Sequence, residues 1–185
     1  MVYNSGYPSD FFLISESSQL FIKGTSSIHD WEMEVTGFKA ETLLKINENA
    51  IAEIKQIQFL SPVSGLKSGK NIMDKKAHDA LKEKKFPAIT FTLDKNNPIK
   101  ISGKKTEISG NLTIAGKTRE VELTADFYIK TSHRFQVKGN VPLKMSHFGI
   151  DPPTALMGAL KTDDQIEITF SLMFEQSGQE FSDNY

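Results

Sequence analysis

Apolar and polar residues alternate with a period of two through most of this chain. Such alternation is typical of β-strands that bury one face and expose the other to water. The clearest runs lie at residues 31–35, 57–59, 89–93, 108–114, 121–127, 135–145 and 166–174. Turn signals lie at residues 95–98, 115–118, 131–134 and 162–164. Strands joined in this way predict an antiparallel barrel or sandwich, and glycines within or beside the runs favour the stronger curvature of a barrel.

One helix is expected between the strands, over about residues 71–84. Asn71 is a suitable N-cap, Met73 and Ala77 follow at helical spacing, and Pro87 stops the segment. The chain has 185 residues and shows no repeat or break in composition. This length and uniformity predict a single domain over residues 1–185.

Composition argues against several classes of function. The 22 basic and 23 acidic residues give a net charge of -1, so nucleic acid is not expected as a partner. The chain contains no cysteine, which excludes disulfides and thiol nucleophiles. No apolar run approaches the ~18 residues of a membrane span, so no integral membrane segment is expected. The histidines lack metal-binding spacing and no serine lies in a nucleophile elbow, so we predict no metal site, no catalytic residues and no enzyme activity.

The segment TSSIHDWEMEV at residues 25–35 holds the single tryptophan of the chain beside a histidine and an aspartate. Apolar residues fall on even positions up to Ile28 and on odd positions from Trp31, so the strand phase must be reset between them. A corner or bulge at the rim of the sheet would reset it, with Asp30 as its capping residue. The alternative is that His29 hydrogen-bonds the polar end of a ligand.

Two further segments have competing interpretations. Residues 67–85 carry seven lysines, which form either the solvated face of the predicted helix or a cationic rim that attracts an anionic head group. The segment GNLTIAGKT at residues 110–118 has Asn111 where a phosphate-binding loop needs glycine. We therefore interpret that segment as a hairpin turn.

Four segments lie in this order along the chain: GTSSIHDW at 24–31, KKFPAITF at 84–91, ISGNLTIAGKTREVEL at 108–123 and HFGIDPPTALMGALKTDDQIEITF at 147–170. Together they resemble the YceI-like family of lipocalin-like, isoprenoid-binding proteins, over about residues 12–175. The resemblance implies an all-β fold, namely an eight-stranded antiparallel lipocalin-like barrel. It also implies an elongated apolar interior, one short inserted helix at about residues 71–84, and loose N-terminal and C-terminal tails.

In proteins of this family the interior holds a long polyisoprenoid chain. The resemblance therefore implies non-enzymatic binding, with carriage or storage, of a long-chain isoprenoid lipid such as a quinone or a prenyl phosphate, and no other cofactor. Bacterial members are commonly exported, so a periplasmic or secreted location is expected, with the signal peptide already removed. The sequence by itself is also compatible with the cytoplasm, and with a homodimer.

Strand parity names the residues expected to line an apolar tunnel. They are Trp31, Met33, Phe59, Phe91, Leu112, Ile114, Phe127, Val137, Phe148, Ile168 and Phe170. His29, Asp30 and His147 are the candidates for contact with a head group. Two other functions stay open at this point. One is an enzyme that acts on a hydrophobic substrate with those same three residues as acid and base groups, and the other is a structural or interaction β-domain with a filled core.

Overall fold

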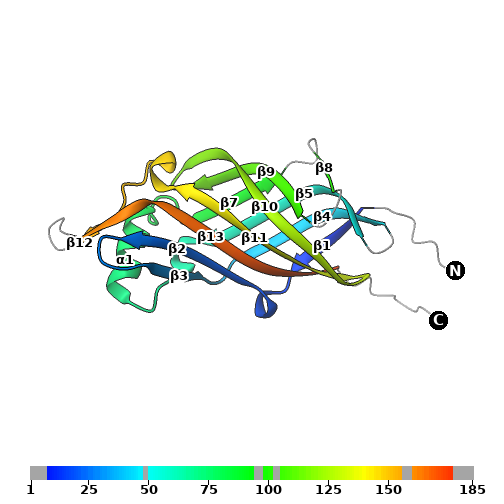
Figure 1. The fold of residues 1–185 in the computed structure, drawn as a ribbon, viewed down its shortest axis with the longest axis horizontal. Coiled ribbons are helices and arrows are strands. Elements are labelled where there is room, and N and C mark those ends of the chain that lie inside the picture. The colour runs from blue at the N-terminus through cyan, green and yellow to red at the C-terminus, as the bar shows by residue number, and fades with distance from the viewer. Residues whose placement is uncertain (1–7, 48–49, 94–97, 102–104, 156–159, 177–185) are drawn as a thin grey trace.

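The computed structural model describes residues 8–47, 50–93, 98–101, 105–155 and 160–176. The described chain forms an elongated β-barrel with one α-helix at one end (Figure 1). The strands are β1 (Ser9–Leu13), β2 (Gln19–Ser26), β3 (Trp31–Val35), β4 (Lys39–Asn47), β5 (Ala50–Pro62), β6 (Leu66–Lys67), β7 (Ala88–Leu93), β8 (Ile99–Lys100), β9 (Lys105–Ile114), β10 (Lys117–Thr131), β11 (Arg134–Lys144), β12 (Thr154–Ala155) and β13 (Leu160–Gln176). The helices are α1 (Asn71–Ala80) and the 3-10 turns η1 (Ser15–Ser17), η2 (Val63–Gly65) and η3 (Met145–Phe148).

The predicted closed, eight-stranded antiparallel barrel is confirmed. Three barrel strands are interrupted and carry two labels each, β1 with β2, β3 with β4, and β5 with β6, and the others are β7, β9, β10, β11 and β13. Every barrel strand pairs antiparallel with the next one along the chain. Both β1 and β2 also pair with β13, so the last strand closes on the first.

The interruption of the second barrel strand lies beside that of the third. Gly37, between β3 and β4, has a φ of 69°, a backbone conformation that glycine adopts without strain. The neighbouring Thr36 donates to the carbonyl oxygen of Gly65 from its backbone nitrogen at 2.9 Å and from its hydroxyl at 3.1 Å. A Cβ on Gly65 would overlap the carbonyl of Thr36. This close contact therefore requires glycine at position 65.

The predicted turns have different outcomes. Ala115 and Gly116 form the tight turn between β9 and β10, with φ of 49° and 77°, and residues 132–133 form the turn between β10 and β11, as expected. The turn predicted at 95–98 falls almost entirely on residues 95–97, which lie outside the described part of the chain. The prediction of a turn at 162–164 is wrong. Those residues belong to β13, whose pairing with β2 shifts register between Thr162 and Ile166.

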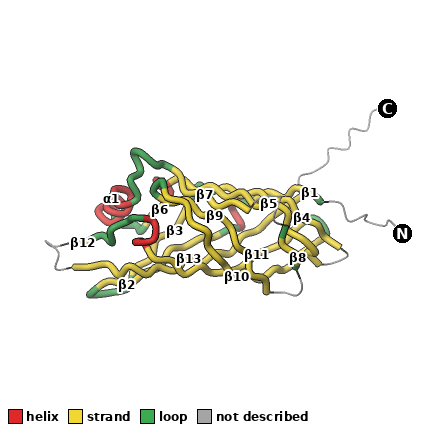
Figure 2. The backbone as a smooth tube through the Cα atoms, turned by 90° about the horizontal axis from the view of Figure 1, so that it is seen from above, coloured by secondary structure: helices red, strands yellow, loops and turns green. Residues whose placement is uncertain are grey.

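Helix α1 is shorter than the predicted segment, because it ends at Ala80 and residues 81–85 form turns. Lys70, and not Asn71, occupies the N-cap position. The carboxylate of Asp74 accepts hydrogen bonds from the backbone nitrogen of Ser68 at 2.7 Å and from its hydroxyl at 2.6 Å. The helix is thereby tied to the segment that follows β6, and it lies at the end of the barrel away from the start of β1 (Figure 2).

Four phenylalanine rings pack together at the end of the barrel opposite α1. There the ring of Phe135 lies 5.3 Å from that of Phe11, 5.1 Å from that of Phe174 and 6.4 Å from that of Phe127, measured between ring centroids. Phe135 and Phe11 are fully buried. We call these four rings the phenylalanine cluster.

We predict that Asp74→Asn lowers the free energy of unfolding by about 1 kcal/mol at neutral pH, because it replaces a charge-assisted hydrogen bond by a neutral one. The hydrogen bonds from Ser68 lower the pKa of the Asp74 carboxyl. Because the pKa is lower in the folded chain, the ionised carboxylate stabilises the fold at any pH above the unfolded-chain pKa of about 3.9. This contribution is lost as the pH falls through the pKa of the folded chain. The urea midpoints of the wild type and of Asp74→Asn, measured against pH, should therefore converge in acid.

The matched control is Asp79→Asn, on the exposed side of the same helix. It should not reproduce the loss seen with Asp74→Asn. Equal midpoints for wild type and Asp74→Asn at neutral pH would show that this contact does not hold α1 in place.

Candidate functional site

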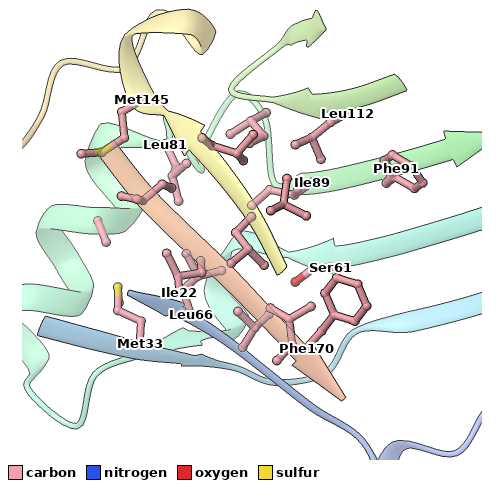
Figure 3. Close-up of a pocket in the computed structure, with 18 of the residues that line it drawn as sticks. Ile22, Met33, Ser61, Leu66, Leu81, Ile89, Phe91, Leu112, Met145 and Phe170 are labelled. Carbon is pink, nitrogen blue, oxygen red and sulfur yellow. The ribbon is translucent and has the colours of Figure 1, made fainter. Parts of the chain in front are cut away.

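The barrel interior contains a cavity of about 950 Å³. This volume lies near the upper end of the range of small-molecule sites, roughly 300 to 1,000 Å³. Side chains from every barrel strand and from α1 line it, and almost all of them are apolar. Figure 3 shows part of the lining, with Ile22, Met33, Leu66 and Phe170 among the labelled residues. The interior is therefore open over much of its length and is not a completely filled core.

All the residues named from strand parity line this cavity. They are Trp31, Met33, Phe59, Phe91, Leu112, Ile114, Phe127, Val137, Phe148, Ile168 and Phe170. Parity succeeds for the ten that lie on strands, because successive side chains of a strand point to opposite faces and every second residue lines the interior of a barrel. Phe148 lies on η3, so its place in the lining does not follow from strand parity. Their contact with a ligand stays a prediction.

Sequence reasoning missed the contribution of α1 to the cavity. Met73, Ala77, Ala80 and Leu81 line it from the helix and the turn that follows. Their helical spacing in the sequence marks one apolar face, but spacing does not say what that face covers. The structure places it over the barrel interior, so the helix closes part of this end.

Glycines on two strands make room for aromatic rings of the lining. A Cβ on Gly24 would overlap the indole of Trp31, its register partner on β3. A Cβ on Gly139 would overlap the ring of Phe170, its register partner on β13. Each ring therefore occupies space that a side chain on the neighbouring strand would otherwise fill.

Few polar groups reach the deep part of the cavity. Thr42 lines it, and its hydroxyl donates to the carbonyl oxygen of Gln56 at 2.8 Å. Ser61 is only 2% exposed and its hydroxyl contacts the carbonyl oxygen of Pro62 at 3.3 Å, a long hydrogen bond. In Figure 3 the oxygen of Ser61 lies among apolar side chains of the lining. The deep cavity thus offers apolar contact with hardly any hydrogen bonding.

The mouth of the cavity lies at the α1 end and carries positive charge. We define the mouth by the lining residues Ser26, Ile28, His29, Lys70, Asn71, Ile72, Lys76, Lys144, Thr154, Lys161 and Thr162. It includes four lysines, and no aspartate or glutamate of the described chain lines the cavity. Lys76 donates to the carbonyl oxygen of Thr154 at 2.7 Å. Lys144 lies near Asp164, whose pKa is lowered mainly by hydrogen bonds from Ser146 and less by this lysine.

The corner predicted between Ile28 and Trp31 is confirmed, but Asp30 does not cap it. Residues 27–30 connect β2 to β3, and the hydroxyl of Ser26 donates to the carbonyl oxygen of His29 at 2.7 Å. The backbone nitrogen of Ser26 donates to the same oxygen at 3.0 Å. Ser26 therefore closes the corner.

The structure does not bring the three proposed polar residues together. His29 lines the mouth, whereas Asp30 and His147 do not line the cavity. His29 contacts the backbone carbonyl of Asp30 at 2.8 Å through Nδ1, and His147 lies on η3, where its carbonyl oxygen accepts a hydrogen bond from Arg119. Over the described ranges the three side chains share no hydrogen bond, so an acid and base pair is not assembled there.

Neither a cluster of metal-ligand side chains nor a membrane-spanning helix is found among the described residues. No group of three or more histidine, cysteine, aspartate or glutamate residues in this part of the chain is placed to hold a metal ion. Within the same residues, no helix combines the length and the apolar character that crossing a membrane requires.

Solved structures with the same fold cover most of the chain. The BcnA protein of Burkholderia cenocepacia has a TM-score of 0.69 at 20% identity, over 87% of this chain and 98% of that one. A polyisoprenoid binding domain from Saccharophagus degradans, implicated in plant cell wall breakdown, has a TM-score of 0.65 at 12% identity, over 90% and 98%. The YceI protein of Campylobacter jejuni has a TM-score of 0.63 at 21% identity, over 80% and 85%.

Sequence comparison is more specific than these likenesses, which show the fold alone. A search of curated proteins finds no match. The model of the YceI-like domain, by contrast, matches residues 14–174, which include the whole cavity lining. The chain therefore belongs to the YceI-like family.

Proposed function

We propose that the protein binds a long-chain isoprenoid lipid in the barrel cavity and carries or stores it outside the cytoplasm. The observation that supports this most strongly is the cavity itself, which is lined by apolar side chains from every barrel strand and, away from the mouth, by three rings of the phenylalanine cluster. The Saccharophagus degradans domain with the same fold is described as polyisoprenoid binding, which agrees with this proposal.

The tail supplies the binding free energy in this proposal. Burying one CH₂ group is worth ~0.8 kcal/mol, so a five-carbon isoprene unit contributes about 4 kcal/mol before ordering costs. The deep lining offers few hydrogen bonds, so a polar head group would lose its hydration there without replacement. The head group therefore stays at the mouth, and the tail extends toward the phenylalanine cluster.

The charge of the mouth favours an anionic head group. Four lysines line it without a lining carboxylate, so a prenyl phosphate fits better than a neutral quinone. His29 is the one residue of the proposed head-group set that lines the mouth. Of the seven lysines in residues 67–85, Lys70 and Lys76 line the mouth. Lys144 and Lys161, from distant segments, line it with them, and these four form the cationic rim that the sequence offered as one alternative.

The first test is native mass spectrometry of the purified protein beside mass spectrometry of its organic extract. We expect one isoprenoid per chain, with a phosphate on its head group. A bound neutral quinone would keep the tail proposal and reject the anionic head group. A protein that is empty and also fails to bind added long-chain prenyl phosphate or quinone would overturn the proposed function.

A pair of alanine variants locates the binding. Ala40 lines the cavity, whereas Ala50 is exposed at the start of β5. We expect Ala40→Phe to fill part of the cavity and weaken tail binding by about tenfold, roughly 1.4 kcal/mol, in a titration followed by Trp31 fluorescence. Ala50→Phe should bind as the wild type does, and equal weakening by both variants would place the ligand elsewhere.

We also predict that the phenylalanine cluster limits tail length. Phe135→Ala removes a buried ring that lines the cavity and lengthens the space for a tail, so the longest tails should gain affinity relative to shorter ones in a competition series of prenyl phosphates. The same change should cost about 3–5 kcal/mol of stability, so the milder Phe135→Leu is measured beside it.

Leu93→Ala is the control for the tail-length experiment, because Leu93 is buried but does not line the cavity. It should destabilise the fold and leave the length preference unchanged. An unchanged preference in both Phe135 variants would mean that tails do not reach this end of the barrel.

A further inference from the structure

Large apolar side chains are exposed at the mouth of the cavity. Among the described residues, Ile72 is 76% exposed and Ile28 is 64% exposed, ahead of Leu60 at 46% and Phe12 at 43%. Ile28 lies in the connection between β2 and β3, and Ile72 lies in the first turn of α1. Both line the cavity, whereas Leu60 and Phe12 do not. The two most exposed of these side chains therefore belong to two separate segments of one mouth.

These segments share one end of the molecule. In Figure 1 the connection between β2 and β3 lies at the same end as α1. Isoleucine side chains this exposed contribute little to the stability of the fold, since burial of apolar surface is what stabilises it. Exposed apolar groups that gather at one place and are bordered by polar residues mark an interaction surface.

Lysines border these isoleucines. Lys70 and Lys76 flank Ile72 in the sequence on the same mouth, and Lys144 and Lys161 line it from other strands. Within the described chain, no ion pair involves these four lysines at salt-bridge distance.

Nearby acidic groups are mostly held by other partners. The Asp74 carboxylate accepts from Ser68, that of Asp163 from Thr25 and that of Asp164 from Ser146. Asp30 is exposed in the connection between β2 and β3, and Asp164 lies near Lys144. The lining itself nevertheless remains free of carboxylates over the described residues.

We infer that the mouth is a docking surface for an anionic lipid bilayer. Apolar side chains among lysines are the pattern of proteins that bind at the membrane interface, where the apolar groups enter the boundary of head groups and acyl chains and the lysines meet lipid phosphates. The cavity opens on this surface. A docked barrel would thus let a lipid tail move between bilayer and cavity without crossing water. This transfer goes beyond the tail binding of the proposed function.

The test is co-sedimentation with vesicles of phosphatidylcholine, alone or mixed with phosphatidylglycerol. We expect the full chain to bind the mixed vesicles more strongly and to lose binding as salt is raised, because salt screens charges over about 10 Å at 0.1 M. The double variant Ile28→Ser, Ile72→Ser should lose about tenfold in affinity for the mixed vesicles. The double variant Lys70→Gln, Lys161→Gln should lose the preference for phosphatidylglycerol.

The matched control is Phe12→Ser, Leu60→Ser, which removes exposed apolar groups of the barrel wall away from the cavity. It should bind vesicles as the wild type does, and circular dichroism melts verify that each variant is folded. No vesicle binding, equal binding to both compositions, or equal losses in the isoleucine pair and the control pair would each overturn the inference. The measurement is independent of cavity binding, because vesicle docking is scored on wild-type protein whether or not an isoprenoid is bound.

Discussion

The pairing of β1 and β2 with β13 is the interaction on which the rest of the structure depends. Closure removes the free edges of the sheet and forces the inward side chains of all barrel strands to face one another. A barrel of eight strands is just wide enough for side chains or one small ligand. Because β10 has 15 residues and β13 has 17, the enclosed space is long as well as narrow. Its apolar walls therefore enclose an elongated cavity.

Side-chain alternation explains how much of this could be predicted from the sequence. Phe91 and Phe170 were placed in the lining by parity alone, because the face of a strand residue depends only on its position along that strand. The placement of α1 depends on long-range contacts, such as that of the His78 ring with the carbonyl of Leu66, and periodicity carries no such information. This contact also leaves the His78 side chain half-buried.

The errors in the polar segments have the same origin. Asp163 and Asp164 are typical turn residues, but their partners, Thr25 and Ser146, come from distant parts of the chain and hold the segment inside β13. Asp30 also has the character of a turn cap, yet Ser26 closes that corner. A side chain that bonds its own neighbours can be inferred from local sequence, whereas one that bonds another strand cannot.

The two ends of the barrel explain how tight binding and release are compatible. A tail of about eight isoprene units would contribute more than ~30 kcal/mol if fully buried, beyond the ceiling of ~18–21 kcal/mol for non-covalent complexes. Ordering of the tail must absorb the difference, and the bound lipid would still leave for water very slowly. Passage into a bilayer exchanges one apolar environment for another. A mouth with Ile28, Ile72 and lysines against the membrane would therefore remove the water-exposed step, while rings of the phenylalanine cluster line the cavity away from the mouth.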